Sequence, residues 1–383
     1  MKYNFDEVQA RRGTHSIKWD TADADEILPM WIADMDFRTF PPIVDALTRT
    51  TAQGHYGYNI VPSEYYEAIM LWWQKRHGYK IKKDSILPST GVVAGISAIF
   101  SVLTKPGDEV IIQTPAYNHF YNVIKGAGCT PVENELFYED GVYKVDFDDL
   151  ETKARSGKAK ILLLCNPHNP VGRAWNEHEL QSIASICTRH DVYVVSDEIH
   201  SDLLAPGKQH VSFLSVTAAQ HQAIVCSAAS KTFNLSGLHA AYLFVDNEAI
   251  RKEIEVQLWA QGAAAPSLLA CEALKVAYTK GDEWLNELNN YLHGNYQFLK
   301  EFISTNMNNI KVLTLEATYL VWLDCKQTGM KSKELADHLI KNENLWVNPG
   351  DMYGAAGEGF LRINIACPRQ TLIDGLNRLK NIL

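Results

Sequence analysis

The segment AIVCSAASKTFNLSGLH (223–239) carries an apolar run of strand type directly into Lys231. Lysine is rarely buried, because removing its charge from water is costly. A lysine at the end of a buried strand is therefore a candidate for a Schiff-base amine, whose basicity burial adjusts. The alternative is a lysine whose long side chain extends to solvent.

Three similar runs come before this one, namely EVIIQTP (109–115), KILLLCNP (160–167) and VYVVSDEI (192–199). All four are short, rich in Val and Ile and apolar on both faces, which is typical of buried parallel strands. Between the second and third lies an amphipathic helix, NEHELQSIASICTRHD (176–191). This alternation predicts an α/β fold with a mostly parallel sheet sandwiched by helices. Ligands of such sheets bind at the carboxyl ends of the strands.

The C-terminal part of the chain has a different pattern. TYLVWLDCK (318–326) and GFLRINIAC (359–367) indicate strands, and KSKELADHLIKN (331–342) and QTLIDGLNRLK (370–380) indicate helices beside them. We expect a smaller α+β domain here. A chain of 383 residues is also longer than the roughly 250–300 at which one core stops growing. The predicted division is 1–47 joining the small domain, a large domain at 48–282, and the small domain at 283–383.

Composition excludes several classes of function. The net charge is −9 without a long basic run, so nucleic acid is not expected as a partner. No apolar stretch approaches the roughly 20 residues of a membrane span, and 1–20 has no apolar core of a signal peptide. The seven cysteines form no CxxC pair, which argues against a metal site and for reduced thiols. We expect a cytoplasmic protein.

Chemically distinctive residues follow the predicted strands. Gly91, in STGVVAGI, precedes a helix whose N-terminus would favour an anion such as phosphate. Asn169 lies in the turn CNPHNPVG (165–172), and Asp197 ends the strand of VVSDEIHSD. Each has an ordinary interpretation as a turn or helix-capping residue. Asn169, Asp197 and Lys231, in this order after consecutive strands, together suggest one ligand.

Pyridoxal 5′-phosphate has the groups that these residues would bind. Its aldehyde suits Lys231, its pyridine nitrogen suits a carboxylate at Asp197, its phenolate oxygen suits the amide of Asn169, and its phosphate suits the helix after Gly91. A carboxylate beside the ring nitrogen keeps that nitrogen protonated, which makes the ring a better electron sink.

The chain resembles the fold-type-I pyridoxal-phosphate enzymes of the class I/II aminotransferase superfamily, and most closely the cystathionine β-lyase-like C–S lyases of the MalY/PatB group. The resemblance covers nearly the whole chain. It rests on KWD (18–20), LPMWIADMDF (28–37), YGY (56–58), STGVV (89–93), CNPHNPVGR (165–173), SDEIHSD (196–202), SKTFNLSGL (230–238) and GEGFLRINIACPR (357–369). It implies a seven-stranded sheet in the large domain, and a homodimer with active sites at the interface.

The resemblance also implies a role for each site residue. Lys231 is similar to the Schiff-base lysine that also moves the proton, Asp197 to the partner of the pyridine nitrogen, and Asn169 to the donor to the phenolate oxygen. The remaining roles implied are phosphate binding by the amides of Gly91, Val92 and Val93, stacking on the ring by Tyr117, contact with the neighbouring subunit's phosphate by Tyr58, and binding of the substrate carboxylate by Arg362. Core positions for the two tyrosines and a surface position for Arg362 are the alternatives.

The sequence departs from the wider superfamily around the phosphate. Ala228 and His239 stand where a hydroxyl and an arginine are common, so Ser227 and Ser230 are the remaining hydroxyl candidates. His200 stands where a tyrosine is common, as is expected of the C–S lyase group. The segments HSIKWD and LPMWIADMDF are expected to border the pocket.

The expected reaction is α,β-elimination on an amino-acid substrate. Arg362 would hold the carboxylate, Lys231 would take the Cα proton, and a thiolate would leave from Cβ. L-Cystathionine or another cysteine S-conjugate would give pyruvate, ammonia and a thiol. An aminotransferase is the first alternative, because the same residues serve its first steps. A non-catalytic regulator on this scaffold is the second, but the lysine, aspartate and arginine that it would lack are all present.

Overall fold

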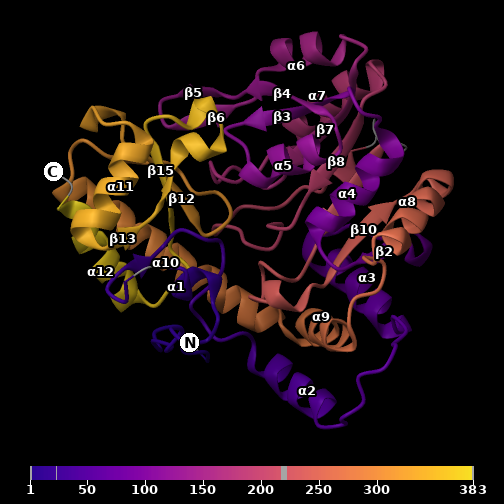
Figure 1. The fold of residues 1–383 in the computed structure, drawn as a ribbon, viewed down its shortest axis with the longest axis horizontal. Coiled ribbons are helices and arrows are strands. Elements are labelled where there is room, and N and C mark those ends of the chain that lie inside the picture. Colours follow the sequence, from indigo (N-terminus) through magenta and orange to yellow (C-terminus); the bar gives the residue numbers. More distant parts are fainter. Residues whose placement is uncertain (1, 23, 217–221, 382–383) are drawn as a thin grey trace.

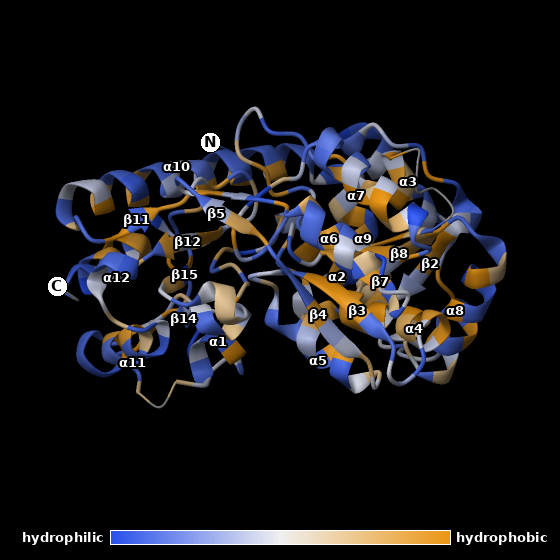
Figure 2. Ribbon diagram, turned by 90° about the horizontal axis from the view of Figure 1, so that it is seen from above, coloured by the Kyte–Doolittle hydropathy of each residue, from blue (hydrophilic) through white to orange (hydrophobic). Residues whose placement is uncertain are grey.

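The computed structural model describes residues 2–22, 24–216 and 222–381. Two bodies lie side by side, a large one built on a helix-covered sheet and a smaller one that contains both the N-terminal segment and the C-terminal elements (Figure 1, Figure 2). The predicted α/β class with a second, smaller α+β part is confirmed.

The large body is built on a seven-stranded sheet in the order β2-β10-β9-β8-β7-β3-β4. Strand β10 runs antiparallel to both of its neighbours, and the other pairs are parallel. The predicted mostly parallel sheet is therefore confirmed. Its strands are β2 (Ile86–Ser89), β3 (Glu109–Thr114), β4 (Thr130–Glu135), β7 (Ala159–Cys165), β8 (Tyr193–Asp197), β9 (Ala223–Ser227) and β10 (Ala241–Val245).

Both faces of this sheet are buried under helices. Alternate residues of β7 belong to separate cores, with Leu162 and Leu164 in one and Ile161 and Leu163 in the other. This explains the unbroken apolar character of the strands. Helices of the first face are α3 (Ser63–His77), α6 (Phe147–Ala154), α7 (Glu177–Arg189) and α9 (Leu268–Lys280), with α2 (Pro41–Thr51) packed on α9; those of the second are α4 (Val92–Leu103), α5 (Asn118–Gly126) and α8 (Glu248–Ala260).

The smaller body contains a four-stranded antiparallel sheet in the order β11-β12-β15-β14. Its strands are β11 (Lys311–Val312), β12 (Leu320–Asp324), β14 (Asn348–Pro349) and β15 (Phe360–Asn364), and its helices are α10 (Asp282–Asn306), α11 (Ser332–Glu343) and α12 (Arg369–Lys380). A short hairpin, β5 (Phe137–Glu139) and β6 (Val142–Lys144), extends from the large body.

The N-terminal segment reaches the smaller body. After the short helix α1 (Ile17–Asp20), strand β1 (Leu28–Pro29) pairs in parallel with β13 (Leu345–Trp346). The domain boundaries placed at 47/48 and 282/283 stay predictions.

Local sequence signals account for helix α7. Asn176 accepts a hydrogen bond from the backbone N–H of Glu179, and the Glu179 carboxylate accepts one from the backbone N–H of Asn176. This reciprocal capping box satisfies two amides that the first helical turn leaves without partners.

Two findings bear on the excluded classes. Across the three described ranges, no helix is long and apolar enough to cross a membrane. All seven cysteines lie within those ranges, and all are buried and free of disulfide bonds.

Candidate active site

The carboxyl ends of three adjacent strands meet at one pocket. Asp197 is the last residue of β8, Asn169 follows β7, and Lys231 follows β9. Because these strands are neighbours in the sheet, the three side chains converge. The pocket is lined by Ala33, Val92, Val93, Tyr117, Cys165, Asn169, Asp197, Ile199, His200 and Lys231.

Lys231 points its amine at a main-chain carbonyl. Its Nζ donates to the oxygen of Ala33 at 2.6 Å. Burial of the amine lowers the pKa of Lys231 to about 8; the charges of Asp34 and Asp197 oppose the shift, and that of Arg362 adds to it. A substantial fraction of this amine is therefore neutral at mildly alkaline pH, the form that can act as nucleophile or base.

Asp197 is a buried carboxylate. Burial raises its pKa to about 7, an effect that the Ile199 N–H, at 3.1 Å from Oδ1, and the charge of Lys231 offset only in part. A cationic group brought against this carboxylate would restore its ionised form.

Arg362, on β15 of the smaller body, hydrogen-bonds to Asn169 in the wall of the pocket. This buried guanidinium donates from Nη1 to Asn169 Oδ1 at 3.0 Å and from Nη2 to the carbonyl of Trp31 at 2.7 Å, and it lies 5.0 Å from the ring centre of Tyr353. Among the described residues its Nε has no hydrogen-bond partner. The guanidinium is thus already oriented before a ligand binds, and its Nε–H remains available as a donor.

The start of α4 forms another wall of the pocket. Gly91 is the N-cap residue, and no side chain caps this helix. Val92 and Val93 line the pocket, so the first-turn amides of α4 are available to an anion there.

Two more of the expected residues line the pocket. Tyr117 immediately precedes α5, and burial raises its pKa to about 12. Burial lowers the pKa of His200 to about 3, so its imidazole is neutral at physiological pH, with its ring centre 6.2 Å from that of Tyr319.

Five expected site residues are not among those that line the pocket: Gly91 and Arg362 adjoin lining residues, and the other three are Ser227, Ser230 and Tyr58. Ser227 is buried and donates its hydroxyl to the carbonyl of Glu198 at 3.3 Å. Ser230 is partly buried and precedes Lys231. Tyr58 is fully exposed on this chain. The burial and hydrogen bonds of these three side chains do not indicate a ligand group for any of them.

The sequence did not identify Cys165 and Ile199, although each lies within a motif that it singled out. The expectation that LPMWIADMDF borders the pocket is confirmed by Ala33, whereas HSIKWD contributes no residue to the lining. Its detailed contacts, including those with Asn234 and Asn364, were not predictable, because they join main-chain atoms to residues far away in sequence.

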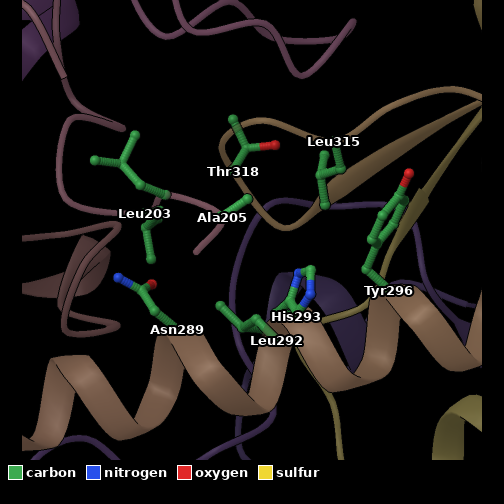
Figure 3. Close-up of a pocket in the computed structure, with 9 residues that line it drawn as sticks. Leu203, Ala205, Asn289, Leu292, His293, Tyr296, Leu315 and Thr318 are labelled. Carbon is green, nitrogen blue, oxygen red and sulfur yellow. The ribbon is translucent and has the colours of Figure 1, made fainter. Parts of the chain in front are cut away.

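A second hollow lies between α10 and the segments around residues 203–205 and 315–318 (Figure 3). Its volume is about 10 Å³, which leaves room for no more than one water molecule. Its lining shares no residue with the pocket of Lys231.

Comparison with known proteins agrees with this geometry. The chain is 39% identical to "Cystathionine beta-lyase PatB" of Bacillus subtilis over 99% of this chain and 100% of that one, and 33% identical to "Protein MalY" of Escherichia coli over 100% and 99%. The crystal structure of cystalysin from Treponema denticola, which contains pyridoxal 5′-phosphate, superposes with a TM-score of 0.96 at 33% identity and covers 100% of this chain and 99% of that one. The resemblance inferred from the motifs is confirmed. The family model for aminotransferase class I and II matches residues 27–379, and the chain belongs to that family.

Proposed function

We propose that this chain is a pyridoxal-phosphate-dependent C–S β-lyase that cleaves L-cystathionine or a related cysteine S-conjugate. The observation that carries the proposal is the convergence of Lys231, Asp197 and Asn169 opposite the uncapped start of α4. The name of the full-length relative "Cystathionine beta-lyase PatB" supports the same reaction.

The donor set fits the cofactor. Lys231 would bind the aldehyde, and its lowered pKa favours that reaction. Asp197 would hold the pyridine nitrogen, whose positive charge would stabilise the buried carboxylate. Asn169 would donate to the phenolate oxygen and the first-turn amides of α4 to the phosphate. Tyr117 would cover the ring, beside His200; Ser227 and Ser230 remain the hydroxyl candidates. When bound, this cofactor supplies an electron sink for the electron pair left at the substrate Cα.

The chain's own residues would then orient the substrate and move the proton. Arg362 binds the α-carboxylate, with Asn169 beside it, and so fixes which Cα bond faces Lys231. Once the substrate amine has taken its place at the aldehyde, the freed Lys231 amine would remove the Cα proton, the Cβ–S bond would break, and the sulfur would leave with the bonding electrons as a thiolate. Water then hydrolyses the remaining three-carbon unit to pyruvate and ammonia. Apolar side chains at Ala33, Val92 and Ile199 limit the access of other water molecules to the reacting atoms.

The decisive experiment measures pyruvate released from L-cystathionine by the cofactor-loaded protein without added 2-oxo acid, with Lys231→Ala as control. Sustained pyruvate release over many turnovers that depends on Lys231 supports the lyase. Amino transfer that appears only after a 2-oxo acid is supplied would instead make the protein an aminotransferase. Absence of both activities would favour a non-catalytic role.

We further propose that the protein works as a homodimer with Tyr58 at the neighbour's phosphate. The support is a set of exposed large apolar side chains: Ile60 and Trp259 line one groove, and Tyr56, Tyr58 and Val256 are close to groove residues in sequence. Exposed apolar side chains grouped in this way are typical of protein–protein contact surfaces. A cytoplasmic location stays a prediction, in keeping with seven buried, unpaired thiols.

A further inference from the structure

Residues 31–37 (WIADMDF) cross from the smaller body to the turn that carries Lys231, and we call this segment the strap. Two asparagines, one buried and one partly buried, hydrogen-bond to its main chain. One belongs to the strand of Arg362 and the other to the turn of Lys231.

Asn364 holds the first half of the strap. It lies on β15 two residues after Arg362 and is almost fully buried. Its Nδ2 donates to the carbonyls of Ile32 and Asp34, both at 2.7 Å, and its Oδ1 accepts from the N–H of Ala366 at 2.7 Å. One amide group thus holds the carbonyls on both sides of Ala33.

Asn234 holds the second half. It lies three residues after Lys231, and its φ of 56° is in the left-handed region that asparagine tolerates better than most residues. Its Nδ2 donates to the carbonyls of Met35 at 2.9 Å and Phe37 at 3.2 Å, and its Oδ1 accepts from the N–H of Met35 at 3.1 Å. Its side chain therefore pairs with the strap as a neighbouring strand would.

Two strap carbonyls contact the two cationic side chains of the site. The oxygen of Ala33 accepts from Lys231 Nζ at 2.6 Å and from the hydroxyl of Tyr319 at 3.0 Å. The oxygen of Trp31 accepts from Arg362 Nη2 at 2.7 Å, and from Asn348 Nδ2 at 3.1 Å. Among the described residues, the strap is the segment that accepts hydrogen bonds from both of these side chains.

Ion pairs also hold the strap, and the pair of Lys18 with Asp36 is buried. Lys18 is 1% exposed and pairs with Asp36 at 2.8 Å, while Arg11 donates to the carbonyl of Met35 at 2.8 Å and pairs with Asp34 and Asp36, each at 3.2 Å. A buried charge that loses its partner is costly. The strap therefore cannot shift without separating these pairs, which favours a single position for its carbonyls.

We propose that the strap positions the Lys231 amine and the Arg362 guanidinium relative to each other, and that Asn234 and Asn364 are positioning residues that act through it. This inference rests on the proposed function, in which Lys231 moves the Cα proton of a substrate held by Arg362. A carbonyl that accepts a hydrogen bond from an amine restricts where that amine's lone pair can point. Misplacement of reacting groups by about 1 Å can lower a rate roughly 100-fold.

The test isolates the proton step. L-Alanine carries no leaving group at Cβ, so the cofactor-loaded protein in D₂O should exchange its Cα hydrogen for deuterium without elimination, which proton NMR follows. In Asn234→Gly the backbone keeps its positive φ while the clamping amide is lost. We expect its maximal exchange rate to fall roughly 10- to 100-fold. The alanine concentration for half-maximal rate should stay within about twofold, because the contacts of Arg362 are retained.

Asn364→Ala removes the clamp next to Arg362. We expect both the slower exchange and a several-fold higher half-saturating alanine concentration. Tyr319→Phe, which removes one hydroxyl and keeps the ring, provides a milder variant should Asn364→Ala fold poorly, with an expected loss of roughly threefold to tenfold in exchange rate. A second measurement, amide deuterium uptake by the strap peptide in the loaded protein, should increase in both asparagine variants.

Asn134→Ala is the matched control. This buried asparagine on β4 also donates to a carbonyl, that of Asp146 at 3.0 Å, and to the Asp149 carboxylate at 2.8 Å, but it contacts neither the strap nor the pocket. It should leave exchange and strap uptake unchanged. Wild-type exchange rates in the strap variants, or an equal loss in Asn134→Ala, would overturn the inference. Wild-type exchange without pyruvate release from L-cystathionine would overturn the lyase reaction alone.

Discussion

Arg362 Nη1 donates to Asn169 Oδ1 at 3.0 Å, which links β15 of the smaller body to the turn after β7 in the large body. The amide of Asn169 faces the same pocket as Lys231. This hydrogen bond therefore connects the proposed site of carboxylate binding with the proposed cofactor site.

This geometry predicts that a positive charge alone at position 362 does not suffice to bind the substrate carboxylate. Arg362→Lys keeps the positive charge but loses the planar fork that binds Asn169, the Trp31 carbonyl and a carboxylate at once. We expect KM for L-cystathionine to rise roughly 10- to 100-fold, with a much smaller change in kcat. Steady-state pyruvate release measures both constants.

Arg369→Lys is the comparison for this variant. The Arg369 guanidinium binds Asn295 at 2.8 Å and lies 4.7 Å from the ring centre of Phe298, and neither of these partners lines the pocket, whereas Arg362 binds the lining residue Asn169. Its KM should match that of the wild type. Equal KM values in the two lysine variants would show that Arg362 does not bind the substrate.

Asp197 predicts a stability effect that changes sign with the cofactor. Its folded pKa is about 7 against 3.8 for the free side chain, so between these values the folded chain retains a proton that the unfolded chain has lost. The free energy of unfolding of the cofactor-free protein should therefore fall as pH rises from about 4 to 7. Above pH 7 it should be roughly 4 kcal/mol lower than below pH 4, as far as this one group is concerned.

Asp197→Asn removes this titration. Without cofactor it should be more stable than the wild type, by a margin that is larger at pH 8 than at pH 5. With cofactor the order should reverse, because the pyridine nitrogen loses its carboxylate partner. Thermal unfolding of both proteins at both pH values, with and without cofactor, measures the four differences. A margin that does not depend on pH would contradict the assignment.

Asp202 connects α3 to the turn that carries Lys231. Its carboxylate accepts from Trp72 Nε1 at 3.1 Å and from Thr232 Oγ1 at 3.0 Å, and it contacts His77 Nε2 at 3.0 Å. Burial alone would raise the pKa of Asp202, but His77 and the other donors lower it. Its stabilising contribution is therefore present at neutral pH and is lost only as pH falls through the lowered pKa, below 3.8.

Asp202→Ala should lower the free energy of unfolding at pH 7.5 by about 3–5 kcal/mol, because it leaves several buried donors without an acceptor. Denaturant unfolding of the loaded protein measures the loss. Asp282→Ala, which also removes a carboxylate paired with α3, through Lys75 and Arg76 near the surface, should cost no more than about 1 kcal/mol. Similar losses in both variants would contradict a special role for the buried carboxylate.

The positions of Asn169, Asp197 and Lys231 could be predicted because each follows a strand whose apolar pattern is continuous. Strands joined by right-handed crossovers through helices tend to lie next to each other in the sheet, so residues at their ends meet. The same reasoning predicted the helix after Gly91, which is α4. It gave no rotamer for Ser227, whose hydroxyl binds the carbonyl of Glu198.

The strap could not be predicted in the same way. Asn234 and Met35 are 199 residues apart, and Asn364 and Ile32 are 332 apart. The acceptors are main-chain carbonyls, which every residue has, so no residue type marks them. Lys18 likewise follows a polar stretch and has the sequence context of a surface lysine. Only the fold brings it to Asp36 and buries it.

The proposed dimer makes two separable predictions. Trp259→Glu places a charge on an exposed apolar residue of the proposed interface, and it should convert a species of twice 43.1 kDa into one of 43.1 kDa in analytical ultracentrifugation. Phe137→Glu makes the same change at an exposed residue on the β5–β6 hairpin and should leave the mass unaltered. A wild-type monomer, or an equal effect of both variants, would contradict this interface.

Shared sites predict that two defective proteins can complement each other. If Tyr58 serves the neighbour's site, a mixed dimer of Lys231→Ala with Tyr58→Ala contains one site with both defects and one site with none. Mixing the two proteins under conditions of subunit exchange should therefore restore pyruvate release, to about a quarter of the wild-type rate when half of the dimers are mixed and each has one intact site out of two. If Tyr58 acts within its own subunit, each site of the mixed dimer keeps one defect and the mixture gains no activity over the average of its components.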